Sequence, residues 1–156
     1  MSSAQSEPLD FGIVLALAYS AFVDELRAEL AAAGHDELHR SFGYVARALT
    51  AEPLTLRELA ERLAITPPGA SKIVDEMQRT GHLERVPDAM DGRAKRLRLT
   101  RRGKAALAAA RRFHARFEAE LAERVGPHAA RQCRVVLQSI IAERALSGSP
   151  PALRPV

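Results

Sequence analysis

The chain has 156 residues, a formal net charge of +4 and one cysteine, and 47% of its residues are apolar but only 4% aromatic. This length suits one domain with a real core, or a small domain with an oligomerising arm. A lone Cys133 excludes an intramolecular disulfide and a cysteine-based zinc site, which favours a reducing compartment. The apolar stretch Phe11–Val23 has 13 residues, too few to span a membrane, and acidic Glu7 and Asp10 before it are unlike a signal peptide. We therefore expect a cytoplasmic protein with no membrane partner.

Two helices are predicted in the N-terminal part. Apolar residues recur at steps of three and four over Phe11–Ala33, and Gly34 is well placed to end that helix. A second helix is predicted over Glu37–Leu49, before Pro53. Because the first half of the first helix is apolar almost all round, we expect it to be buried between two partners. The polar residues 1–8 are predicted to form a flexible tail.

Two short amphipathic helix patterns joined by a tight turn come next. In the first, Thr55 and Glu58 form a capping box, in which each side chain bonds the other's backbone amide. In the second, Thr66 is the N-cap and Pro67 takes the first helical position, where its missing N–H costs nothing. Gly81 is predicted to close this second helix.

Two short strands are predicted after these helices, at Leu83–Val86 and Lys95–Leu99, with Asp91-Gly92 as the turn signal between them. The order of helix, turn, helix and strand pair is typical of a winged helix-turn-helix, a unit that reads DNA.

A long helix is predicted from Thr100 to about Val125, where Gly126 and Pro127 end it and start a last helix. Its apolar positions follow a seven-residue beat: Leu107, Ala110, His114, Phe117 and Leu121. We expect a mainly α fold with dimerisation helices at 9–36 and 100–146, a winged helix-turn-helix at 37–99, and a second flexible tail at 147–156.

Most of the excess positive charge lies beside the predicted wing. Nine basic residues and no acid fall between Arg93 and Arg112. A solvated surface would explain most such runs, but this one follows a helix-turn-helix pattern, so we expect contact with double-stranded DNA. The N-terminal turns of a recognition helix meet the base edges, and small residues there allow close approach. The candidate DNA-binding residues are Pro68, Gly69, Ser71, Lys72, Asp75, Arg79, Asp91, Arg93, Lys95 and Arg96.

Two of these residues have alternative interpretations. Asp75 either accepts a hydrogen bond from cytosine or holds a basic neighbour in place. Arg93, beside the Asp-Gly turn, either enters the minor groove or is an ordinary turn residue.

The segment 55–104 resembles the MarR family of winged-helix transcriptional regulators. Asp91-Gly92-Arg93 stands in the place of the family's D-x-R wing tip, and residues 99–103 are similar to its L-T-x-x-G. The resemblance implies a triangular homodimer whose first and last helices interlock and whose two winged domains bind a pseudo-palindrome. It also implies a repressor released by a small phenolic or anionic ligand. Pro68 and Gly69 occupy positions that are more often Ser or Thr in the family, which implies fewer side-chain hydrogen bonds at the helix start.

The resemblance further implies a ligand pocket where the first two helices meet the winged domain. The candidate pocket residues are Phe11, Tyr19, His39, Phe42, Tyr44 and Arg47. His35 and His39 lie four apart, but Gly34 breaks the helix, so we expect exposed histidines rather than a metal pair. We expect Cys133 to be a packing residue and His114 an interface residue. No metal and no cofactor are predicted.

Other classes of function are weighed against DNA binding. A winged-helix module that binds proteins without reading DNA has the same elements, although the basic run argues against it. We expect no enzyme, because the sequence shows no Ser/His/Asp set, paired-carboxylate site, Gly-rich phosphate loop or metal cluster.

Overall fold

A computed structural model describes residues 8–88, 90 and 94–146 of the chain. The elements in order are α1 (Phe11–Ala32), α2 (Phe42–Ala48), α3 (Leu56–Leu63), α4 (Pro67–Arg79), β1 (Leu83–Pro87), β2 (Lys95–Leu99), α5 (Arg101–Val125) and α6 (Pro127–Leu146). This confirms the predicted fold, a mainly α winged helix-turn-helix with long flanking helices and a two-stranded wing. Residues 1–7 of the predicted tail 1–8, and the whole predicted tail 147–156, lie outside the described residues.

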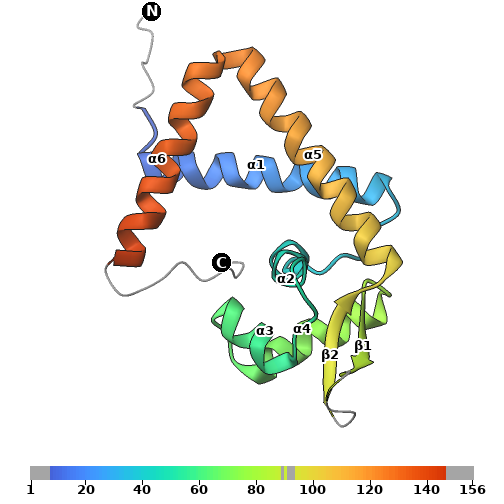
Figure 1. Cartoon of the computed structure of the whole chain (residues 1–156). Helices are drawn as coiled ribbons and strands as arrows, with labels where there is room; N and C mark the ends of the chain where they lie inside the picture. The colour runs from blue at the N-terminus through green and yellow to red at the C-terminus, as the bar shows by residue number, and fades with distance from the viewer. Residues whose placement is uncertain (1–7, 89, 91–93, 147–156) are drawn as a thin grey trace, which may run out of the picture.

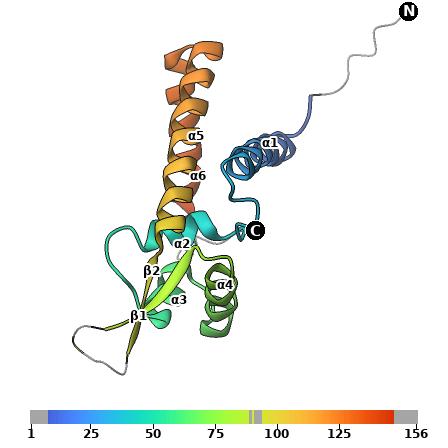
Figure 2. The same cartoon turned by 90° about the vertical axis from the view of Figure 1, so that its right-hand side faces the viewer.

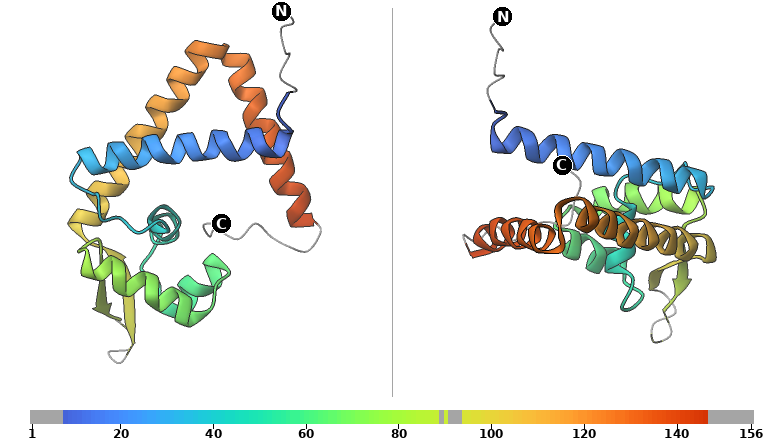
Figure 3. Two further views of the ribbon diagram at one scale, coloured as in Figure 1. Left: turned by 180° about the vertical axis from the view of Figure 1, so that it is seen from behind. Right: turned by 90° about the horizontal axis from the view of Figure 1, so that it is seen from above.

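The molecule is a compact winged head with three long helices beside it (Figure 1). Helix α5 runs away from the head, and α6 turns back from its far end on the other side of the molecule, so that the two helices form an inverted V. Seen from the side, α1 lies apart from the α5–α6 pair for most of its length (Figure 2). Its main contacts are with α5, where Arg116 makes two hydrogen bonds to the Glu29 carboxylate at 3.1 and 3.2 Å. The view from above also shows that α1 comes close to α5 near the C-terminal end of α1 and lies apart from α6 (Figure 3).

The helix starts follow the capping residues in the sequence. The Thr55 amide donates to Glu58 Oε2 at 2.7 Å and the Glu58 amide donates to Thr55 Oγ1 at 3.2 Å, which completes the predicted capping box. Thr66 and Thr100 cap α4 and α5 in the same way, accepting from the amides three residues later. These bonds to Thr55 lower the pKa of the Glu58 carboxyl below its ordinary value.

The two strands form an antiparallel ribbon in which Leu83 pairs with Leu99 and Arg85 with Leu97. Leu54, before α3, forms an isolated bridge to Leu97, so the loop after α2 adds a short third segment to the wing. Leu97 and Leu99 are buried, as the alternation of leucine and arginine predicts.

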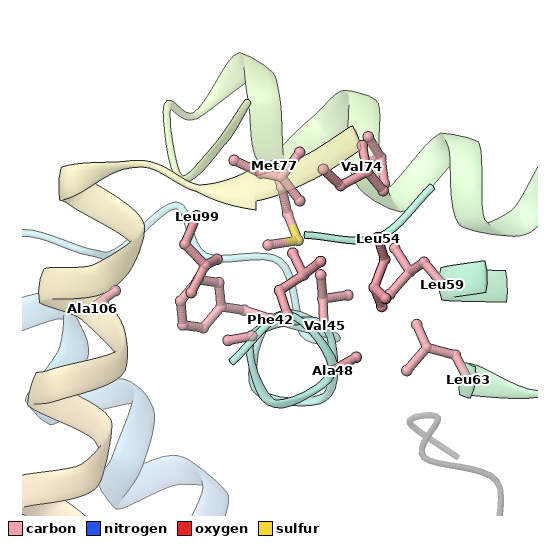
Figure 4. Close-up of a cluster of buried hydrophobic side chains, with 14 residues drawn as sticks. Phe42, Val45, Ala48, Leu54, Leu59, Leu63, Val74, Met77, Leu99 and Ala106 are labelled. Carbon is pink, nitrogen blue, oxygen red and sulfur yellow. The ribbon is translucent and has the colours of Figure 1, made fainter. Parts of the chain in front are cut away.

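The core of the head is built from α2, α3, α4, the wing and the start of α5 (Figure 4). Its largest fully buried side chains include Leu54, Leu59, Leu63, Met77 and Leu97. Burying a side chain of this size stabilises the fold by roughly 1.5–3 kcal/mol. The core therefore fixes the orientation of α4 relative to the wing.

Two predictions in the segment between α1 and α2 were wrong. The second helix begins at Phe42 rather than at Glu37, since the His39 ring accepts the Ser41 amide at 3.0 Å and residues before Phe42 form turns. His35 is buried, with only 8% of its surface exposed, although we expected it to be exposed. Gly34, with a φ of +81°, ends α1 and turns the chain so that His35 points inward.

The long helices also depart from the sequence pattern. The buried residues of α5 are Gly103, Ala106, Ala109 and Phe113, rather than the predicted seven-residue beat. In one chain, four residues of that beat are half-buried and His114 is exposed. His114, Phe117 and Leu121 line a cleft between α1, α5 and α6, whereas Leu107 packs against the core of the head. Cys133 is exposed in the single chain, contrary to the packing role expected for it. Within the described part of the chain, no helix is long and apolar enough to cross a membrane.

Candidate nucleic-acid interface

Helix α4 has one face in the core and the other in solvent. Ala70, Val74 and Met77 are buried, with no measurable exposure. On the other side, the predicted contact residues form a stripe at helical spacing: Pro68, Lys72, Asp75 and Arg79 are exposed, and Gly69 and Ser71 are partly exposed. The structure thus brings together all six candidate residues predicted on this helix.

An arginine of the wing is bonded to this stripe. Arg85 Nη2 on β1 donates to Asp75 Oδ1 at 2.8 Å, and Arg85 Nη1 donates to Gln78 Oε1. The Ser71 hydroxyl donates to the other oxygen of Asp75 at 3.3 Å. Of the two interpretations of Asp75, the geometry in this structure matches the one in which it holds a basic neighbour. Arg85 therefore links the wing to the middle of α4.

Sequence reasoning missed Arg85 and Gln78, although one signal for Arg85 was available. Arg85 has the same strand parity as buried Leu83 and stands opposite buried Leu97. A basic residue at a buried-side position needs a partner that satisfies its donors. Its side chain is only 29% exposed, and Asp75 supplies that partner.

The wing residues divide into two groups. Lys95 is exposed, whereas Arg96 donates to the Pro53 carbonyl at 3.0 Å and forms an ion pair with Asp88. Arg96 thus ties β2 to the loop before α3 in this structure. The other two wing candidates, Asp91 and Arg93, lie outside the described residues.

Several cations near this stripe have no counter-charge among the residues that the structure describes. Lys72, Arg79, Lys95 and Arg101 form no ion pair with any other described residue. The first turn of α5 contains Arg101, Arg102 and Lys104 and no acid. Positive charge at a helix N-terminus opposes the helix dipole, so this clustering does not serve the stability of α5. An anionic partner would stabilise this cluster of positive charges.

The six predicted pocket residues are spread over different environments. Phe42 lies in the core, Phe11 and Arg47 are exposed, and the His39 ring lies 3.7 Å from Glu76 of α4. Tyr19 and Tyr44 are brought together from α1 and α2: burial, followed by a hydrogen bond to Tyr19, raises the pKa of Tyr44.

A separate cleft of about 520 Å³ lies between α1, α5 and α6. None of the six predicted pocket residues lines it; Phe22, His114, Phe117, Arg131 and Cys133 do. No group of three or more His, Cys, Asp or Glu side chains that could hold a metal occurs among the described residues.

The comparisons with known proteins agree with this geometry. A model of the MarR family matches residues 42–94, which include α2, α3, α4, β1 and the wing tip. Over these residues the chain is similar to the MarR family. A search of curated proteins gave no match.

Solved structures of transcriptional regulators and of a heme sensor share this fold. S. aureus MepR in a complex with DNA superposes with a TM-score of 0.65 at 19% identity, covering 85% of this chain and 96% of MepR. The transcriptional regulator PA3341 gives 0.61 at 25% identity, covering 86% and 97%. The heme sensor PefR from Streptococcus agalactiae, in complex with heme, gives 0.63 at 20% identity, covering 92% and 97%. These similarities extend the shared fold from the winged head to the long helices.

Proposed function

We propose that this chain is a cytoplasmic, homodimeric transcriptional regulator that binds double-stranded DNA and acts as a repressor, without enzymatic activity. The observation that carries the proposal is the exposed stripe of α4, anchored by the core and by Arg85, with uncompensated cations beside it. In support, MepR, a protein with the same fold, has been solved with DNA.

In the proposed complex, the first turns of α4 enter the major groove. Gly69 and Ser71 permit close approach of the backbone, and Lys72 reaches a base edge or a phosphate. Asp75, held by Arg85, fixes the rotation of α4 in the groove. Lys95 contacts phosphate from the wing, and Arg93 at the wing tip enters the minor groove. Arg96 supports the wing through Asp88 rather than contributing a free charge.

The dimer would be formed by the helices of segments 9–36 and 100–146. Large apolar side chains are exposed on the N-terminal half of α1 and on α6, among them Phe11, Leu17 and Tyr19 of α1 and Val135 and Ile141 of α6. Such a patch on a monomer is typical of an interaction surface. A two-fold dimer would place two copies of α4 about one DNA turn apart, suited to a pseudo-palindromic operator. A small phenolic or anionic effector, bound near Tyr19 and Tyr44, would release the DNA.

The test is a selection of bound fragments from random duplex DNA, followed by affinity measurement on the recovered sequence. We expect the selected fragments to share an inverted repeat. We expect sedimentation velocity to show that the protein is a dimer. Repeating the selection with salicylate, a phenolic anion, tests for an effector. Recovery of no sequence above background, with the protein folded, would contradict the proposal.

A further inference from the structure

Two histidines form a buried pair that the proposed DNA contacts do not use. His35 follows α1 and His82 lies between α4 and β1, 47 residues away. Nδ1 of His35 lies 3.2 Å from Nε2 of His82, and the two rings are 8% and 0% exposed. A buried imidazole pair needs a defined arrangement of protons, since each neutral ring has one donor and one acceptor.

The surrounding bonds assign those protons. The Thr80 hydroxyl donates to the backbone carbonyls of Glu76 and Met77, at 3.2 and 3.3 Å, so its oxygen accepts from Nδ1–H of His82 at 2.9 Å. Nε2 of His82 then carries the lone pair. It accepts from His35 Nδ1–H and from Arg102 Nε–H at 3.3 Å, and arginine can only donate. These bonds therefore require a neutral His82 ring, and the burial of His35 beside Arg102 favours a neutral His35 ring as well.

Acid would break this arrangement. A proton on Nε2 of His82 would replace the acceptor with a second N–H facing the Arg102 guanidinium, with like charges in contact. The groups around His82 are Arg102 of α5, His35 and Glu37 of the α1–α2 loop, Thr80 at the end of α4 and the Phe42 ring of α2. Burial first, then Arg102, then His35 lower the pKa of His82, with Glu37 opposing them. Burial and then Arg102 lower the pKa of His35.

The pair lies at a joint between the long helices and the DNA-reading head. Arg102 Nη2 donates to the Gly34 carbonyl at 3.0 Å, which ties the start of α5 to the end of α1. The Thr100 amide donates to the His82 carbonyl at 3.2 Å, and the Thr100 hydroxyl donates to the Gly81 carbonyl at 2.6 Å. Figure 1 shows this region, where α1 ends beside the lower half of α5.

We propose that His35, His82 and Arg102 form a proton-sensitive joint that weakens DNA binding when the pH falls. The inference rests on the proposed function and names its regulation. With both rings neutral, the joint holds α1 and α5 at a fixed angle to α4. We call this hydrogen-bonded arrangement the closed joint. Because its two histidines must stay neutral, the closed joint is stable above the ordinary histidine pKa and is lost as the pH falls below that value. An open joint changes the separation of the two heads in a dimer.

The experiment uses the full chain and a duplex selected by the protein at about pH 7.5. The double variant His35→Asn/His82→Gln replaces the Nδ1–H donor and the Nε2 acceptor with amide groups that do not titrate. Exposed His128 provides the matched control His128→Gln. Affinity for the duplex and hydrogen exchange at the Thr100 amide, corrected for the intrinsic effect of pH, are measured at about pH 7.5 and about pH 5.5.

The unaltered protein and the control should lose about tenfold in affinity at the lower pH, because a histidine of ordinary pKa about 6.5 that must stay neutral disfavours the closed joint about tenfold one pH unit below that value. Their Thr100 amide should exchange faster there. The double variant should keep its affinity and its protection. An equal loss in the double variant, or no loss in the unaltered protein, overturns the proposal.

Two further outcomes keep the test decisive. If the double variant does not fold, His35→Asn alone should show a smaller loss than the unaltered protein, and an equal loss overturns the proposal. If no duplex is recovered, the proposed function has failed, and the joint is judged by exchange alone. Unchanged protection of Thr100 at the lower pH then overturns the joint itself.

Discussion

Gly103 allows the start of α5 to pack against the chain after α4, and replacing it offers a sharp test of that joint. A Cβ built on Gly103 would lie 2.0 Å from the His82 carbonyl oxygen and 3.3 Å from Leu99 Cδ2. Real Cβ atoms do not approach oxygen this closely, and the obstacle is backbone rather than a flexible side chain. Gly103→Ala therefore forces α5 away from residue 82 by more than an ångström.

The expected cost follows from two opposing terms. Overpacking of a well-packed site costs typically about 1–3 kcal/mol and more where backbone must move. Alanine in place of glycine within a helix returns roughly 1 kcal/mol. We expect a net loss of about 2 kcal/mol in the free energy of unfolding, because this clash is severe and buried.

Denaturant unfolding followed by circular dichroism measures this loss, and Gly43→Ala is the matched control. Gly43 lies in α2, and nothing lies within 4 Å of a Cβ built there. That substitution should stabilise the protein by up to about 1 kcal/mol. If Gly103→Ala proved as stable as Gly43→Ala, the close packing of α5 against His82 would be refuted.

Three further predictions concern the head. Arg85→Ala should lower stability by about 1 kcal/mol, since Asp75 is 58% exposed and the pair is partly screened. A double-mutant cycle with Asp75→Ala should show a coupling energy of similar size, and additive effects would refute the link between wing and α4. Thr55→Ala should lower the free energy of unfolding by about 1 kcal/mol, because it removes the N-cap of α3. The control is Thr50→Ala at the end of α2, which removes a single hydrogen bond to the Ala46 carbonyl and no N-cap. The lowered pKa of Glu58 makes its contribution present above the ordinary carboxyl pKa and lost as the pH falls, so Glu58→Gln should flatten acid unfolding below about pH 4.5.

Local signals in the sequence predicted most element boundaries. The capping residues Thr55, Thr66 and Thr100 begin α3, α4 and α5, and Gly126 with Pro127 separates α5 from α6. Each signal acts within one helical turn, so a single stretch of sequence contains all its partners. The six α4 candidates share one solvent face for the same reason.

Features that depend on distant partners were not predictable. His35 and His82 meet across 47 residues, and nothing near either one in the sequence indicates the other. Arg96 belongs to the basic run, but only the folded wing brings it to Asp88 and the Pro53 carbonyl. The late start of α2 has the same origin, because the residues before Phe42 are held by the contact of His39 with Glu76 of α4 and by burial of Ser41.

The affinity of the protein for its selected duplex, as a function of salt, tests the central claim most directly. A plot of the logarithm of the binding constant against the logarithm of the salt concentration has a slope of about −0.9 for each phosphate contact. Lys72→Ala or Lys95→Ala should weaken binding and make this slope shallower by up to the value for one contact. Arg124→Ala, which removes an exposed charge at the far end of α5, is the control and should change neither. Equal affinities and slopes for Lys72→Ala, Lys95→Ala and Arg124→Ala would contradict the assignment of α4 and the wing as the DNA-reading surface.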